Sequence, residues 1–164
     1  MSPVQIRVAE EADLPKLEWS GAFTHHRAII QEAFALQQRG EVLMLVADLD
    51  GFPVGQAWMD FRPEPGRVVP KVWAMRVLPE CRGSGIGSRL MRELERCAWR
   101  KGCSELQLYV EKDNTQARRF YERLGWRITG ERADNYSYLT PAGVREFVPL
   151  DLWVFVKSRP TVPV

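Results

Sequence analysis

The chain has 164 residues, 45% of them hydrophobic, which suits one globular domain with a sizeable core. Its 23 basic and 21 acidic side chains leave a formal charge of +2, too small to indicate a nucleic-acid partner or a membrane surface. No apolar run approaches the roughly 20 residues that cross a bilayer, and the first residues lack the apolar core of a signal peptide. We therefore expect a cytoplasmic protein.

The first half of the chain predicts a strand, two helices and a hairpin. Asp13 is a plausible N-cap for the first helix, and Gly40 is suited to end the second. The dipeptide Asp50-Gly51 between two apolar runs is a signal for a hairpin turn. A loop rich in Pro, Gly and charge follows at residues 62–70. The strand, the helices and the two hairpin strands are expected at residues 5–9, 10–19, 24–39, 42–48 and 53–61.

The second half predicts strands that alternate with helices. Its helices are expected to end at Gly102 and Gly125. Residues 132–146 are polar and are predicted to form a long loop. The strands are expected at residues 71–77, 105–110, 126–131 and 147–157, with one helix between the first two and another between the second and third. We expect one domain, residues 1–158, and a frayed tail, residues 159–164.

The stretch after the strand at residues 71–77 has the composition of an anion site. Gly83, Gly85 and Gly87 lie two apart, so the backbone can approach a ligand closely, and a loop that opens into a helix presents N–H groups with no intrahelical partner. The helix dipole and Arg82 add positive charge. A pyrophosphate is the expected ligand, although an isolated G-x-G-x-G is more often a flexible turn. The spacing fits neither a dinucleotide motif nor a P-loop.

Two motifs resemble the GNAT superfamily of N-acetyltransferases. Arg82, Gly85 and Gly87 fill its acetyl-CoA motif, [RQ]-x-x-G-x-[GA], and residues 114–126, N-T-Q-A-R-R-F-Y-E-R-L-G-W, resemble its second motif, N-x-x-A-x-x-x-Y-x-x-x-G-[FW]. The order of the expected elements also resembles that of the family. The resemblance implies an α/β fold: a mixed, mostly antiparallel sheet of about six or seven strands, flanked by helices and splayed at two central parallel strands.

The resemblance further implies acetyl-CoA as co-substrate. Main-chain amides of residues 82–88 would hold its pyrophosphate, main-chain groups of Met75 and Val77 would bind the pantetheine arm and the acetyl carbonyl, and Tyr121 would protonate the leaving thiolate. Asn114 would hydrogen-bond the pantetheine arm and can at the same time cap its helix. The implied cofactor-binding residues are Met75, Arg76, Val77, Arg82, Gly83, Ser84, Gly85, Ile86, Gly87, Ser88, Asn114, Ala117, Phe120 and Tyr121.

The catalytic base is left open. The positions that we align with the family's glutamate hold Lys71 and Tyr109, so Asp60, Glu80, Glu111 and a water chain all stay candidates. No metal is expected, because the cysteines form no C-x-x-C pair and are odd in number. They are Cys81, Cys97 and Cys103.

The acceptor is expected to be a primary amine, either of a small molecule or of a protein lysine or N-terminus. The alternative is a catalytically silent domain that binds an acyl-CoA. Histidines that could shuttle protons or be merely exposed are His25 and His26, and aromatic residues that could line an amine pocket or fill the core are Trp19, Phe23, Trp58, Tyr136 and Tyr138. The apolar final strand could also pair with a second copy, which would give a homodimer.

Overall fold

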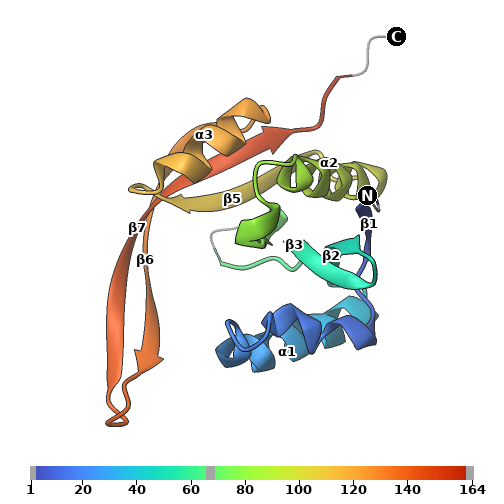
Figure 1. The fold of residues 1–164 in the computed structure, drawn as a ribbon. Helices are drawn as coiled ribbons and strands as arrows, with labels where there is room; N and C mark the ends of the chain where they lie inside the picture. The colour runs from blue at the N-terminus through green and yellow to red at the C-terminus, as the bar shows by residue number, and fades with distance from the viewer. Residues whose placement is uncertain (1–2, 66–68, 162–164) are drawn as a thin grey trace. The chain divides into compact units, whose positions relative to one another are not determined.

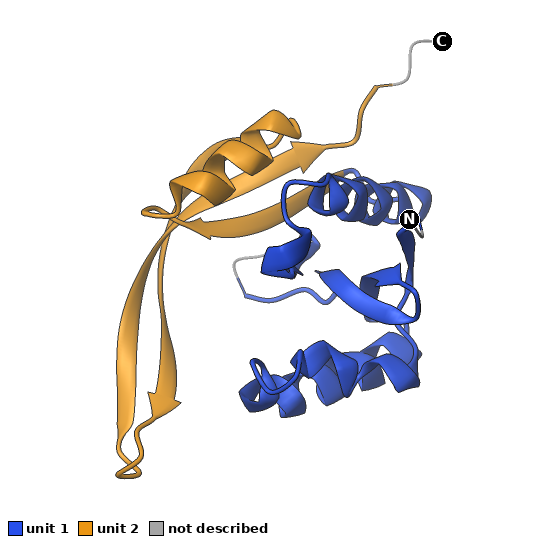
Figure 2. Cartoon of the chain, viewed as in Figure 1, with its two compact units in different colours: residues 1–104 blue, residues 105–164 orange. Residues whose placement is uncertain are grey.

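The computed structural model describes residues 3–65 and 69–161. The chain divides into two compact units, residues 1–104 and residues 105–164 (Figure 2). Parts of the predicted loop at residues 62–70 and of the predicted tail at residues 159–164 lie outside the described residues. The assignment of residues 1–158 to one domain stays a prediction.

Unit 1 contains four strands that pair antiparallel in chain order (Figure 1). They are β1 (Gln5–Val8), β2 (Val42–Leu49), β3 (Phe52–Asp60) and β4 (Lys71–Val77). Between β2 and β3 the turn residues Asp50 and Gly51 both have positive φ angles, 52° and 87°. This is the turn geometry that matches the twist of a hairpin. The predicted first strand, hairpin and fourth strand are confirmed.

Two α-helices cover opposite faces of these strands, α1 (Arg27–Gln38) and α2 (Ile86–Arg100) (Figure 1). On the α1 face, Leu17, Ile30 and Trp58 belong to one buried apolar cluster. On the α2 face, Gly55 lets the helix approach closely, because an added Cβ there would lie only 3.1 Å from Leu90 Cδ1. Both helices occur where the sequence predicts them, although the first turn before α1, η3 (Thr24–His26), is a 3₁₀ helix.

The predicted helix at residues 10–19 is wrong. The segment forms two separate 3₁₀ turns, η1 (Glu11–Asp13) and η2 (Lys16–Glu18). Asp13 does not cap a following helix, because its carboxylate already accepts hydrogen bonds from elsewhere. Pro15 supplies no N–H group, and Trp19 ends the second turn in the left-handed region with a φ of 46°. One α-helix, not two, therefore precedes the hairpin.

A buried ion pair fixes η1 to the sheet. The side chain of Asp13 is only 3% exposed, and it accepts two hydrogen bonds from the Arg7 guanidinium at 2.7 and 2.8 Å and one from the Glu10 N–H at 2.7 Å. Arg7 Nε also donates to Asp48 of β2 at 2.9 Å. Burial alone would raise the pKa of Asp13, but the hydrogen bonds from Arg7 and Glu10 outweigh it and lower the pKa below its usual value.

Unit 2 contains three strands and one helix. In chain order they are β5 (Glu105–Glu111), α3 (Thr115–Arg123), β6 (Arg127–Leu139) and β7 (Arg145–Ser158). β7 pairs antiparallel with β5 on one side and with β6 on the other. α3 lies over these strands, where the rings of Tyr121 and Phe155 are 6.2 Å apart (Figure 1). The strand, helix and strand predicted between residues 105 and 131 are confirmed.

The predicted polar loop at residues 132–146 is wrong. These residues complete β6 and begin β7, and only residues 140–144 lie between the two strands. The pairing of β6 with β7 runs on to Leu139↔Arg145, whereas β5 pairs only with residues 152–158 of β7. This outer part of the hairpin is a two-stranded ribbon with exposed side chains on both faces, so its sequence lacks the apolar alternation of a half-buried strand.

Among the helices of residues 3–65 and 69–161, none has the length and apolar character of a membrane span. The same residues contain no group of three or more His, Cys, Asp or Glu side chains that could hold a metal ion. The three cysteines are free thiols.

We predict that Asp13→Asn lowers the free energy of unfolding by roughly 3 kcal/mol, because it removes one partner of a buried ion pair. The stabilisation by Asp13 is complete above a pH of about 4 and is lost as the pH falls through its lowered pKa in the folded protein. Urea unfolding at a series of acidic pH values should therefore show a steep loss of stability in the wild type and a shallower one in Asp13→Asn. The exposed neighbour Glu11 supplies the control, Glu11→Gln, and equal slopes in all three proteins would contradict the prediction.

Candidate active site

The loop between β4 and α2 passes through two glycines in the left-handed region. After β4 the chain makes a short 3₁₀ turn, η4 (Pro79–Cys81), and then passes through Gly83 and Gly85 with φ angles of 78° and 83°. Any other residue would be strained at these angles, so glycine is needed for its backbone. A Cβ atom at either position would meet no atom within 4 Å, so the space beside both glycines is open.

The main-chain N–H groups that follow this turn have no acceptor in the part of the chain that the structure describes. α2 begins at Ile86, so the N–H groups of its first three residues have no intrahelical partner. Among the described residues, no N–H group of residues 83–88 donates to a protein acceptor. The N–H of Arg82 differs, because it donates to the Pro79 carbonyl at 3.3 Å. Of the predicted row at residues 82–88, the N–H groups of residues 83–88 are therefore available to a ligand.

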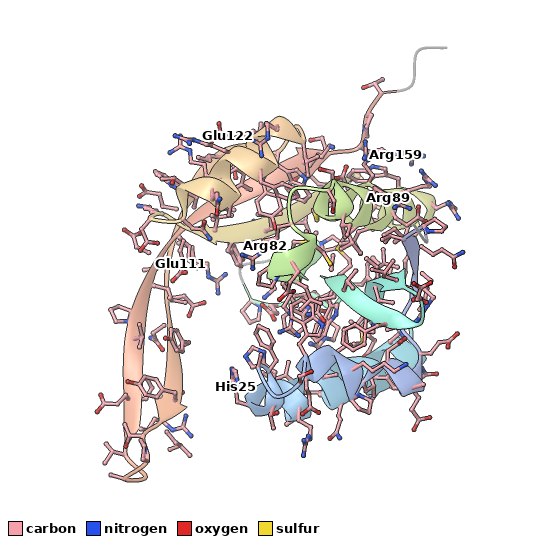
Figure 3. All side chains as sticks on the ribbon, in the orientation of Figure 1. His25, Arg82, Arg89, Glu111, Glu122 and Arg159 are labelled. Carbon is pink, nitrogen blue, oxygen red and sulfur yellow. The ribbon has the colours of Figure 1, made fainter. Side chains whose placement is uncertain are left out.

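Two arginines place positive charge at this end of α2. Arg82 comes from the loop and Arg89 from the beginning of the helix (Figure 3). Arg82 Nε donates to the Val77 carbonyl at 3.1 Å, which holds the side chain against the end of β4, and Arg89 Nη2 donates to the Val4 carbonyl at 2.8 Å. Together with the helix dipole, these groups make the beginning of α2 suitable for an anion such as a phosphate.

β4 contains a bulge that the sequence does not predict. The register of β3 and β4 shifts between the pairs Gln56↔Arg76 and Trp58↔Trp73. One residue of β3 therefore lies opposite two of β4, and one of these two, Ala74, has a φ of 55°. Residues three positions apart in a regular strand point to opposite faces, but the bulge brings the side chains of Trp73 and Arg76 to the same face.

The side chain of Arg76 points to the α1 face. Its guanidinium lies over the ring of Phe23, with Cζ 3.6 Å from the ring centroid, and near the ring of Trp19 at 4.8 Å. The sequence predicts that both aromatic residues line an amine pocket or fill the core, whereas Arg76 appears only among the implied cofactor-binding residues. The signal that could have found this side chain is a lone charge in an apolar strand, V-W-A-M-R-V-L.

The other candidate side chains lie in different surroundings. Trp58 is part of the buried core, and His26 is half-buried beside Phe23, with the ring centroids 5.3 Å apart. His25 is exposed (Figure 3). Tyr136 and Tyr138 are exposed on the ribbon of β6 and β7 in unit 2. Trp19 and Phe23 are therefore the two predicted aromatic residues that contact Arg76.

The second motif forms the beginning and one face of α3 in unit 2. Asn114 is the N-cap, and its Oδ1 accepts a hydrogen bond from the Ala117 N–H at 3.1 Å. The predicted capping role is confirmed, and the side-chain NH₂ group of Asn114 is left to donate elsewhere. Ala117, Phe120 and Tyr121 follow at spacings that bring them to one face of the helix.

Tyr121 is buried among aromatic rings. It is 8% exposed, and its ring lies 5.0 Å from that of Phe120 and 6.2 Å from that of Trp126. Among the described residues its hydroxyl has no hydrogen-bond partner. Burial raises the pKa of Tyr121 above its usual value, because the phenolate would lose solvation. The hydroxyl therefore stays protonated at neutral pH and can donate a proton.

The three carboxylates considered as catalytic bases differ in their partners. Asp60 is 3% exposed and accepts hydrogen bonds from the main-chain N–H of Arg62 at 2.9 Å and from its guanidinium at 3.1 Å. A carboxylate that is paired with a guanidinium is a weaker base than a free one. Glu80, on η4, and Glu111, at the end of β5, are both exposed.

Solved structures of acetyltransferases resemble this chain over nearly its whole length. The ribosomal-protein-alanine N-acetyltransferase from Brucella melitensis is 24% identical with a TM-score of 0.74, and the match covers 94% of this chain and 99% of that one. YncA from Salmonella typhimurium, solved with its cofactor acetyl-CoA, is 23% identical with a TM-score of 0.69 and 99% coverage of both chains. The PaiA N-acetyltransferase from Thermoplasma acidophilum, solved with coenzyme A, is 19% identical with a TM-score of 0.70, over 97% of this chain and 100% of that one.

The sequence profile of the acetyltransferase (GNAT) family matches residues 9–126, well over half of the chain. This range contains both the glycine loop and the second motif. The family, the fold class and the N-acetyltransferase class that the sequence predicts are thereby confirmed. The solved structures that contain acetyl-CoA or coenzyme A are consistent with the predicted co-substrate. On the combined strength of this profile match and the shared fold, the chain belongs to the acetyltransferase (GNAT) family.

Proposed function

We propose that this protein transfers the acetyl group of acetyl-CoA directly to a primary amine. The observation that supports this most strongly is the row of N–H groups of residues 83–88, which have no acceptor in residues 3–65 and 69–161 and lie beside positively charged Arg82. Main-chain donors at the start of a helix suit a diphosphate, because each phosphate oxygen can accept from an N–H group and the dipole favours the negative charge. The pyrophosphate of acetyl-CoA supplies such a group.

The bulge in β4 supports the proposed position of the thioester. In the register of β3 and β4, Met75 has no partner of its own, so the main chain of β4 departs there from regular pairing. We assign the pantetheine arm and the acetyl carbonyl to main-chain groups of Met75 and Val77. An N–H group there would polarise the carbonyl and stabilise the oxyanion that forms when the amine attacks.

The remaining cofactor contacts come from α3. The side-chain NH₂ of Asn114 donates to the pantetheine arm while its Oδ1 caps the helix, and Ala117 and Phe120 line the path of the arm. Tyr121 donates its proton to the leaving thiolate of coenzyme A. A buried phenol with a raised pKa is protonated before the reaction, as this role requires.

The amine must lose a proton to attack, because an alkyl ammonium with a pKa of about 10 is charged at neutral pH. The exposed carboxylates Glu80 and Glu111 and a water chain are the candidates for the proton acceptor, whereas Asp60 is engaged by Arg62. The acceptor class is the amine of a small molecule or of a protein lysine or N-terminus. A silent acyl-CoA-binding domain would bind acetyl-CoA without releasing its thiol.

We predict that Gly85→Ala weakens acetyl-CoA binding by about tenfold or more, since a free-energy loss of about 1.4 kcal/mol suffices for that factor. Gly85 has a φ of 83°, at which an alanine is strained, so the alanine shifts the main chain and displaces the N–H groups that hold the pyrophosphate. The matched control is Gly143→Ala, because Gly143 has a φ of 79° and equally open surroundings but lies in unit 2, between β6 and β7. Isothermal titration calorimetry with acetyl-CoA measures both, and equal dissociation constants would contradict the proposed pyrophosphate site.

We predict that Tyr121→Phe lowers kcat by about 100-fold, because general-acid catalysis by a positioned side chain contributes roughly that factor. The dissociation constant of acetyl-CoA should change little, since the ring that packs in the core is retained. Release of coenzyme A thiol across a panel of primary amines measures the rate, with the exposed Tyr136→Phe as control.

In the wild type, deprotonation of Tyr121 should cause no loss of activity below a pH of about 10, because the pKa of its hydroxyl lies above the usual value for tyrosine. Unchanged turnover in Tyr121→Phe would remove Tyr121 from the mechanism. Tight acetyl-CoA binding without thiol release for any amine would favour the silent domain instead.

A further inference from the structure

Unit 1 contains a cation without a counter-ion on the α1 face of β4. Arg76 is half-buried, and no carboxylate of the described residues pairs with it. The nearest interactions of its guanidinium are with the rings of Phe23 and Trp19 and with the Leu17 carbonyl, which accepts a hydrogen bond from Nη2 at 3.2 Å. Burial alone lowers the pKa of Arg76 to about 10, so the side chain is still charged at neutral pH.

Two nitrogen atoms of this guanidinium are buried and donate to nothing. Nε and Nη1 have no hydrogen-bond partner, although buried donors in proteins are almost always paired. Rings cover the flat side of the guanidinium, so its hydrogen-bond donors remain at the edge of the plane. An unpaired buried charge is costly, and a planar fork of N–H donors matches the two oxygens of a carboxylate.

No carboxylate of the described residues neutralises Arg76 in these surroundings. The ring centroids of His25 and His26 lie 4.1 Å apart, and that of His26 lies 5.3 Å from that of Phe23. Burial lowers the pKa of His26, and the positive charges of His25 and Arg76 lower it further. Glu18, on η2 before this segment, is paired with Arg27 at 2.9 Å. The group therefore has hydrogen-bond donors and positive charge but lacks an anion.

The chain holds this arrangement in place at a cost in backbone strain. Trp19 has a φ of 46°, which is uncommon for a bulky residue. Its indole Nε1 donates to the Pro53 carbonyl at 3.0 Å, and its ring lies edge-on to that of Phe23 at 5.6 Å. The bulge at Ala74, with a φ of 55°, turns Arg76 toward these rings. The residues with these positive φ angles, Trp19 and Ala74, thus both help to position the guanidinium of Arg76.

Arg76 is also next to the main chain to which we assign the thioester. It lies between Met75 and Val77 in the sequence, and its register partner Gln56 shares its face of the sheet. Gln56 Nε2 donates to the Ala74 carbonyl at 3.0 Å, whereas its Oε1 is buried and accepts from nothing. A ligand that carries an anionic group and an N–H donor would satisfy both Arg76 and Gln56.

We propose that Arg76 binds a carboxylate of the acetyl acceptor, so that the acceptor is a small amino acid-like molecule with a carboxylate near its primary amine. This inference rests on the proposed acetyltransferase function. The carboxylate accepts at the end of the guanidinium, where Nη1 of Arg76 has no partner, and the amine beside it faces the acetyl carbonyl at Met75 and Val77. Polycationic amines are disfavoured, because they would meet the charged guanidinium of Arg76 without a counter-ion.

The test compares amines that differ only in the carboxylate. The twenty protein amino acids and their primary carboxamides are assayed with acetyl-CoA by thiol release, with spermidine as the polycation. We expect kcat/KM for the preferred amino acid to exceed that for its carboxamide by about 10- to 100-fold, the range for a charge-assisted hydrogen-bonded pair. The amine of a carboxamide is less basic than that of the free amino acid, so more of it is neutral and able to attack. The amine itself therefore does not produce a preference for the amino acid.

Variants of Arg76 assign the preference to this side chain. Arg76→Met removes the charge and keeps the bulk, and it should lower kcat/KM for the amino acid by about 10- to 100-fold while the ratio of acid to carboxamide falls toward one. Arg76→Lys keeps the charge but loses the planar fork, so its ratio should be intermediate. The control is Arg92→Met, which removes an exposed positive charge from α2 and should keep the wild-type ratio. The acetyl-CoA dissociation constant of each variant reports whether β4 has moved.

The outcomes separate this inference from the proposed function. Turnover of amines with no preference for the carboxylate, or a preference that survives in Arg76→Met, overturns the role of Arg76 but leaves the acetyltransferase intact. If no amine is acetylated, the carboxylate site is tested by calorimetry instead. The amino acids and their carboxamides are titrated into the wild-type protein saturated with coenzyme A. Tighter binding of one amino acid than of its carboxamide supports the carboxylate site, and equal or absent binding overturns it. The wild-type comparison needs no variant, so the test holds even if Arg76→Met fails to fold.

Discussion

The turn from β4 into α2 is the constraint on which the chemistry proposed for unit 1 depends. Gly83 and Gly85 take up φ angles near 80°, so the helix starts immediately after the turn and its first N–H groups have no acceptor among the described residues. Such a site is built from the main chain and requires particular side chains at few positions. This is consistent with solved relatives that share the fold at only 19–24% sequence identity.

The buried carboxylate of Asp13 and the half-buried guanidinium of Arg76, both in unit 1, have opposite surroundings. Asp13 is paired with Arg7 and with a main-chain N–H, and its lowered pKa shows that these partners outweigh the cost of burial. Arg76 has aromatic rings and one carbonyl but no carboxylate partner among the described residues, and burial lowers its pKa. A satisfied charge contributes to folding, as Asp13 does by joining η1 to β1. A charge that folding leaves unsatisfied is available to a ligand, which is the physical basis for assigning a carboxylate to Arg76.

The sequence predicts those parts of the fold in which local signals agree with burial. The hairpin at Asp50-Gly51 and the helices that end near Gly102 and Gly125 occur as expected, because turn chemistry and apolar periodicity indicate the same structure there. The ribbon at residues 132–146 could not be found in this way, since a strand with both faces exposed has no apolar alternation. The helix expected at residues 10–19 failed because the partner of Asp13 is Arg7 of β1, a contact that spacing along the chain does not reveal.

In the candidate site, the sequence predicts the main-chain feature but not the position of the side chain. The glycine loop was predictable because the role that we propose for it depends on backbone conformation, which glycine spacing indicates directly. The position of Arg76 was not, because it depends on one additional residue in β4 relative to β3, and V-W-A-M-R-V gives no sign of that insertion. Without the bulge at Ala74, Arg76 and Trp73 would point to opposite faces, and Met75 would pair regularly with β3. A single inserted residue therefore both frees the main chain to which the thioester is assigned and directs a cation to the face where we expect the acceptor.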